Sequence, residues 1–201
     1  MLDMPATETS DMPKPSTSTR TPAATLMDVD RIVLTGFMGS GKSTLGPLLA
    51  EQLGWRFLDL DSEIERRDGR IVARIFAENG EPYFRKLEAE ALASLLGRRR
   101  IVLALGGGAP EELGNRLLLE QTPRTAIVYL AAPFEALVAR CLEQPGAAER
   151  PVLADLSAAE RRFKARRRLY ERIAGHTIET AKLNVEQTAA MVLKGLVSQQ
   201  L

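Results

Sequence analysis

Short apolar runs alternate along the chain with longer stretches in which apolar residues recur at helical spacing. Such runs predict parallel strands, because strands covered on both faces are apolar throughout instead of alternating. We assign strands to residues 31–35, 55–58, 101–104, 125–130 and 176–180. We assign helices to residues 43–53, 61–96, 111–120, 133–142 and 185–197. The stretch at 61–96 is interrupted at 68–69 and at 79–82. A further helix starts with Asp155 or Ser157 as its cap and runs to about residue 173. The alternation predicts a three-layer α/β/α fold around a central five-stranded parallel sheet.

Two segments depart from this pattern. Residues 1–28 combine four prolines and many Ser and Thr with few bulky apolar side chains, so they bury too little surface to offset their ordering entropy. We predict a disordered N-terminal tail there and one folded domain over residues 29–201. Residues 144–151 are rich in Gly, Pro and Ala, which predicts a mobile lid at about 143–155.

Composition narrows the function classes. The 27 Lys and Arg against 26 Asp and Glu give a formal net charge of +1, so we expect neither nucleic acid nor membrane as a partner. One cysteine, Cys141, and one histidine, His176, exclude a disulfide framework and a Cys/His zinc cluster. The apolar runs are far shorter than the ~20 residues of a membrane span. We therefore expect a cytoplasmic protein and, without a clear interface signal, a monomer.

The most specific motif is G-F-M-G-S-G-K-S at residues 36–43, between a predicted strand and a predicted helix. Its glycines let backbone N–H groups surround phosphates, while Lys42 reaches the β- and γ-phosphates and the Ser43 hydroxyl can bind Mg²⁺. The motif predicts binding of a nucleoside triphosphate. A GTPase would also need an N-K-x-D string, and the sequence contains none. A motor ATPase would need acidic residues after the strand at 101–104, where glycines stand instead.

Two carboxylates follow the second predicted strand, at Asp59 and Asp61. Side chains at i and i+2 of an extended segment share one face, and the carboxyl end of a parallel strand borders the ligand crevice of such sheets. One carboxylate can support Mg²⁺, and the other can hydrogen-bond an acceptor hydroxyl and take its proton. Alternatively, Asp61 only caps the following helix. Arg85 and the glycines at 106–108 are further candidates, with a solvated helix charge and a flexible turn as the alternatives.

These motifs resemble, in order, those of shikimate kinases, a family of P-loop kinases similar to nucleoside-monophosphate kinases. The matching segments are GFMGSGKST at 36–44, LDLD at 58–61, FRKLE at 84–88, LGGGA at 105–109, RPVL at 150–153 (the family usually has RPLL) and RRRLY at 166–170. The resemblance covers the chain from about residue 31. It implies ATP as co-substrate, one Mg²⁺ per subunit, and phosphorylation of the 3-hydroxyl of shikimate on the route to chorismate and the aromatic amino acids.

The resemblance also implies a role for each matching residue. The phosphates of ATP would be bound by Gly39, Ser40, Gly41, Lys42, Ser43, Thr44 and, from the lid, Arg150. Ser43 would ligate Mg²⁺ directly and Asp59 through water. Shikimate would be held by Asp61, Arg85, Gly107 and Arg166. Lys42, Asp61 and Arg150 would form the catalytic set, with Asp61 as the candidate base.

Some assignments stay open at this stage. Arg167 is an alternative to Arg166 for the acceptor carboxylate, and the roles of Arg140 and of the segment after Thr180 toward adenine are undetermined. The rival functions are a gluconate-type sugar-acid kinase, a non-catalytic ATP-binding module, and a nucleic-acid-binding ATPase that uses the basic helix.

Overall fold

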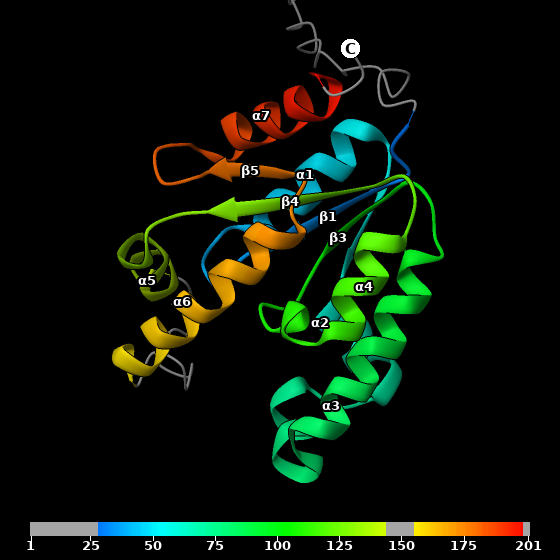
Figure 1. The fold of residues 1–201 in the computed structure, drawn as a ribbon, viewed down its shortest axis with the longest axis vertical. Helices are drawn as coiled ribbons and strands as arrows, with labels where there is room; N and C mark the ends of the chain where they lie inside the picture. Colours follow the sequence, from blue (N-terminus) through cyan, green and yellow to red (C-terminus); the bar gives the residue numbers. More distant parts are fainter. Residues whose placement is uncertain (1–27, 144–154, 199–201) are drawn as a thin grey trace, which may run out of the picture.

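A computed structural model describes residues 28–143 and 155–198 (Figure 1). Its centre is a five-stranded parallel sheet, as the sequence pattern predicted, and the strand order is β2-β3-β1-β4-β5. The strands are β1 (Arg31–Thr35), β2 (Arg56–Asp59), β3 (Ile101–Ala104), β4 (Thr125–Ala131) and β5 (His176–Glu179). Because β1 pairs with both β3 and β4, the loop that follows β1 emerges at the middle of the sheet.

Helices cover both faces of the sheet (Figure 1). One face packs on α1 (Lys42–Leu53) and α7 (Val185–Ser198). The other packs on α2 (Leu60–Asp68), α3 (Val72–Leu96), α4 (Leu113–Gln121) and α6 (Leu156–Ile173). Successive β1 side chains alternate between the two faces. Val33 packs on the face covered by α2, α3, α4 and α6, and Leu34 packs on the face covered by α1 and α7. Because both faces are covered, the whole strand is apolar. The remaining helix, α5 (Phe134–Leu142), packs with α6 around Phe37.

The long helical stretch after β2 is divided as its breaker residues predicted. Helix α2 ends at Asp68, followed by Gly69 in a left-handed conformation (φ 81°), and α3 is kinked at Gly80 (φ 75°, ψ 176°). A short 3₁₀ turn, η2 (Ala109–Glu111), precedes α4, so this helix starts slightly later than its pattern suggested. Asp155 caps α6 by accepting a hydrogen bond from the N–H of Ala158 (2.9 Å), which decides between the two predicted caps.

Two predictions concern residues outside the described ranges. The predicted tail at 1–28 lies there apart from Asp28, and the predicted lid at about 143–155, which contains Arg150, lies there over residues 144–154. Within the described ranges, every helix is too short or too polar to cross a membrane.

Candidate active site

The loop between β1 and α1 surrounds one end of a cavity. Gly36, Gly39 and Gly41 have φ values of 147°, 73° and 95°, a region that residues with a Cβ rarely adopt. At Gly36 a Cβ would also lie only 2.8 Å from the carbonyl oxygen of Leu130. Helix α1 begins directly after Gly41, and no side chain caps its first turn. The positive end of this helix is therefore available to an anion.

Lys42 is held by the loop itself. Its Nζ donates to the carbonyl oxygens of Gly36 (2.8 Å) and Phe37 (3.0 Å) and to Ser40 Oγ (3.4 Å). Burial lowers the pKa of Lys42 to about 8, although the carboxylates of Asp61 and Asp59 oppose this shift. The ammonium group is thus charged at neutral pH and in place to exchange loop carbonyls for phosphate oxygens.

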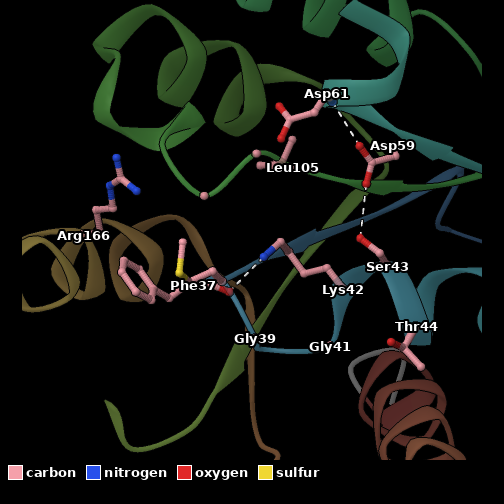
Figure 2. Close-up of a pocket in the computed structure, with 13 residues that line it drawn as sticks. Phe37, Gly39, Gly41, Lys42, Ser43, Thr44, Asp59, Asp61, Leu105 and Arg166 are labelled. Carbon is pink, nitrogen blue, oxygen red and sulfur yellow. Dashed lines mark hydrogen bonds between the residues drawn. The ribbon is translucent and has the colours of Figure 1, made fainter. Parts of the chain in front are cut away.

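The two aspartates after β2 have different positions. Asp59 ends β2 and caps α2: its Oδ1 accepts from the N–H groups of Asp61 (3.1 Å) and Ser62 (3.2 Å). The interpretation that Asp61 is the cap is therefore wrong. Asp61 lies in the first turn of α2, and its carboxylate projects into the cavity (Figure 2). Ser43 Oγ, from α1, donates to Asp59 Oδ2 (3.3 Å), which brings the hydroxyl and carboxylate predicted for the metal together.

The surroundings of the Asp61 carboxyl raise its pKa. Burial first, and then repulsion from Asp59, raise the pKa of Asp61 to about 6, while Lys42 acts in the opposite direction. The backbone of Gly106 passes so close that a Cβ there would lie 2.7 Å from Asp61 Oδ1. A carboxylate with a pKa near the working pH, facing a cavity, is suited to accept a proton from a bound hydroxyl.

Arg166, from α6, lines the same cavity of about 360 Å³ as Lys42, Asp59, Asp61 and Gly107 (Figure 2). Its neighbour Arg167 has a side chain that is 58% exposed and pairs with Glu171 (2.7 Å) instead. Of the two candidates for the acceptor carboxylate, the structure therefore brings Arg166 into the cavity.

Arg85, from α3, lies beside Arg166 without lining the cavity. The Oε2 atom of Glu111 accepts from Nη2 of Arg85 (3.4 Å) and from Nη2 of Arg166 (2.7 Å), so one carboxylate bridges both guanidinium groups. A Cβ at Gly108 would lie 2.8 Å from Arg85 Nη2. The pair of arginines is thus assembled next to the glycines that follow β3.

Three residues of this region have no role in the predictions from sequence. Glu88, 1% exposed, accepts from Nη1 of Arg85 (2.9 Å), and burial raises the pKa of Glu88 to about 7. The buried Tyr170 donates its hydroxyl to the carbonyl oxygen of Gly107. Both residues belong to motifs quoted above, FRKLE and RRRLY, which is the signal that could have found them. Glu111 belongs to no motif and has no such signal.

A second cavity, of about 390 Å³, lies on the other side of the phosphate loop and shares Gly39, Gly41 and Thr44 with the first. Its remaining wall includes Arg140 and residues after Thr180. Arg140 donates through Nη1 to Thr180 Oγ1 (2.9 Å), which fixes the guanidinium group at this wall. A cavity of this size next to a phosphate site can hold the nucleoside part of a nucleotide.

The donor set at Ser43 and Asp59 fits Mg²⁺. Magnesium prefers oxygen ligands, keeps several waters, and is bound through one or two carboxylates together with substrate phosphates. The described residues contain no cluster of three or more His, Cys, Asp or Glu side chains that could hold a metal without such help. A hydroxyl and a carboxylate beside a phosphate loop are therefore the expected protein contribution.

Comparison with known proteins agrees with this geometry. The family model described as "Shikimate kinase" matches residues 38–197. The chain is 39% identical over 166 residues to the shikimate kinase of Geobacter metallireducens, covering 82% of this chain and 90% of that protein. It is 41% identical over 164 residues to the "Bifunctional shikimate kinase/3-dehydroquinate synthase" of Thermotoga maritima, covering 81% of this chain but only 32% of that longer protein.

Solved structures give the same result at the level of the fold. A shikimate kinase from Acinetobacter baumannii in complex with shikimate superposes with a TM-score of 0.80 at 37% identity, covering 90% of this chain and 99% of that one. A gluconokinase from Sinorhizobium meliloti reaches a TM-score of 0.59 at 20% identity over 85% of this chain and 93% of that one, which shows a shared fold alone. The chain combines a phosphate loop with the aspartates Asp59 and Asp61 and the arginines Arg85 and Arg166, and the family model matches most of its length. The chain therefore belongs to the shikimate kinase family.

Proposed function

We propose that this protein transfers the γ-phosphoryl group of ATP to the 3-hydroxyl of shikimate, giving shikimate 3-phosphate and ADP. The observation that carries the proposal is one cavity shared by the phosphate loop, the Asp61 carboxylate and the Arg166 guanidinium group. The similar Acinetobacter structure is a complex with shikimate. A phosphate donor and a small hydroxy acid would thus meet at Asp61.

On the donor side, the N–H groups of residues 39–44 and the Lys42 ammonium would bind the phosphates, and the second cavity would hold the nucleoside. Ser43 would ligate one Mg²⁺ directly and Asp59 through water. When bound, Mg²⁺ supplies positive charge to the β- and γ-phosphates. Arg150, in the segment outside the described residues, would add a further positive charge from the lid at about 143–155.

On the acceptor side, Arg85 and Arg166 would bind the carboxylate of shikimate, for which a guanidinium fork is a good geometric match. Backbone at Gly107, fixed by Tyr170, would contact the ring. Asp61 would accept the proton of the 3-hydroxyl while the hydroxyl oxygen forms a bond to the γ-phosphorus. The bond from that phosphorus to the β,γ-bridging oxygen breaks, and ADP leaves.

We further propose a cytoplasmic monomer with no nucleic-acid or membrane partner, consisting of a tail at 1–28 and a kinase domain at 29–201. The near-neutral net charge of +1 supports the absence of a polyanionic partner. Size-exclusion chromatography with light scattering tests the monomer.

A coupled assay of ADP release tests the activity, with shikimate as acceptor and gluconate as the control acid. We expect the wild type to release ADP with shikimate and not with gluconate. Lys42→Ala should release no ADP with shikimate. Arg85→Ala should raise the KM for shikimate and leave the KM for ATP nearly unchanged, whereas the matched variant Arg167→Ala, at an exposed arginine, should change neither.

Other outcomes favour the rivals. Turnover with gluconate alone would identify a sugar-acid kinase, and ATP binding without turnover on either acid would identify a non-catalytic module. An unchanged KM for shikimate in Arg85→Ala would refute the role of Arg85 in binding the carboxylate.

A further inference from the structure

The bridge made by Glu111 lies where the proposed function needs an empty anion site. A carboxylate oxygen already stands 2.7 Å from Arg166 Nη2 and 3.4 Å from Arg85 Nη2. The acceptor carboxylate would use the same two guanidinium groups. Arg166 pairs with no other carboxylate among the described residues, and a second carboxylate at its guanidinium group would lie close to that of Glu111 and repel it. One of them must leave when the other arrives.

Arg85 has two further carboxylate partners, Glu81, which accepts from its Nη2 (2.8 Å) and Nε (3.2 Å), and Glu88, which is the buried one. Glu88 is 1% exposed, binds Arg85 Nη1 at 2.9 Å, and also accepts from Asn115 Nδ2 (3.4 Å). Moving it would leave Arg85 with an unpaired donor in a buried place, which is costly. Glu88 therefore stays hydrogen-bonded to Arg85 whether or not a ligand is present.

Glu111 differs because its side chain can leave while its backbone stays. The side chain is 35% exposed. Its backbone is held by two hydrogen bonds, from its N–H to the carbonyl oxygen of Gly108 (2.8 Å) and from Arg116 Nη1 to its own carbonyl oxygen (2.9 Å). The carboxylate can thus turn into solvent, where water replaces the arginines.

The contact with Arg166 is also incomplete. The Nε of Arg166 is buried and has no hydrogen-bond partner within the described part of the chain. An N–H group in that state is unfavourable, and a guanidinium group that turns to bind a carboxylate through two donors would recover the missing bond. The Glu111-bound state is therefore one that an incoming carboxylate can replace.

We propose that Glu111 is an internal counter-ion that occupies the arginine pair in the acceptor-free protein and competes with the carboxylate of the acceptor. This inference rests on the proposed function. Glu111 is a positioning residue: it keeps Arg85 and Arg166 together before the acceptor binds, and its displacement lowers the apparent affinity for the acceptor. It also discriminates against neutral polyols, since these offer the arginines no charge in exchange.

The test compares Glu111→Gln with Glu112→Gln. Both variants remove one negative charge at adjacent positions, but Glu112 is half-exposed, reaches only Arg85 Nε at 4.0 Å, and makes no ion pair with Arg166 among the described residues. We expect Glu111→Gln to lower the KM for shikimate by about three- to tenfold, the range for a partly exposed charged hydrogen bond, with kcat changed less than about twofold. Glu112→Gln should leave both constants close to those of the wild type.

Two further measurements separate competition from a structural effect. Calorimetric titration of shikimate into the protein without nucleotide should give a dissociation constant lowered by the same factor in Glu111→Gln. Glu111→Asp, whose shorter side chain draws the carboxylate back from Arg166, should fall between the wild type and Glu111→Gln. Equal effects of Glu111→Gln and Glu112→Gln would indicate long-range charge alone and would overturn the inference.

The remaining outcomes distinguish this inference from the proposed function. If the wild type phosphorylates shikimate but Glu111→Gln has an unchanged or higher KM, the function holds and the counter-ion role is refuted. If the wild type releases no ADP with shikimate, both are refuted.

Discussion

Replacing Asp61 by asparagine should make the protein more stable and inactive. The fold raises the pKa of this carboxyl from its usual value near 3.8 to about 6, so the charged form is disfavoured in the folded state. A change of one pKa unit corresponds to about 1.4 kcal/mol, so the charged Asp61 lowers the free energy of unfolding by up to about 3 kcal/mol at pH 7.5. Asparagine never carries this charge, and its side chain differs little in volume. Partial contact with solvent lowers the gain, and we expect about 1 to 3 kcal/mol.

The size of this stability gain depends on pH in a way that can be measured. The cost is absent below the pKa of the unfolded chain, grows as pH rises from about 4, and is complete above about pH 6. Urea unfolding of wild type and Asp61→Asn at pH 7.5 and pH 5 should therefore show a difference that shrinks by about half at the lower pH. Equal stability of wild type and Asp61→Asn at pH 7.5, or the same gain in stability at both pH values, would refute the argument that the folded state disfavours the charged form of Asp61.

Three other predictions concern the same candidate active site. The kcat/KM for shikimate should fall about tenfold per pH unit below pH 6, since a protonated Asp61 cannot take the proton, and a flat profile between pH 5 and 7 would contradict this. Gly106→Ala should lower kcat by about tenfold or more, because its Cβ would lie 2.7 Å from Asp61 Oδ1 and displace the carboxylate; steady-state kinetics at saturating substrates provide the measurement. Gly108→Ala should mainly raise the KM for shikimate, because its Cβ would lie 2.8 Å from Arg85 Nη2, whereas Gly114→Ala, with open space around the added atom, should not.

Much of the fold could be predicted because both faces of the sheet are buried. Ile32, Val33 and Leu34 are all 0% exposed, so the strand is apolar at every position and stands out from the amphipathic helices. The phosphate loop is also local: its glycines, lysine and serine are consecutive, and the backbone that they require follows from residue type.

The parts that could not be predicted depend on contacts between distant residues. Which aspartate caps α2 depends on the extended backbone of Asp59 (φ −112°, ψ 129°), and residue type alone does not decide this. The contact between Glu111 and Arg166 joins residues 55 positions apart on separate elements. In the sequence, Glu111 has the pattern of an ordinary surface glutamate, and only the packing of α6 beside η2 brings it to the arginines.

The wall that the two cavities share has a thermodynamic consequence. Gly39, Gly41 and Thr44 border both spaces, so a molecule in either one touches backbone that shapes the other. Any influence of the first occupant on the affinity for the second must then operate with equal strength in the reverse direction. Binding of two ligands at these cavities is for that reason described by two separate affinities and a single coupling constant that is the same in both directions.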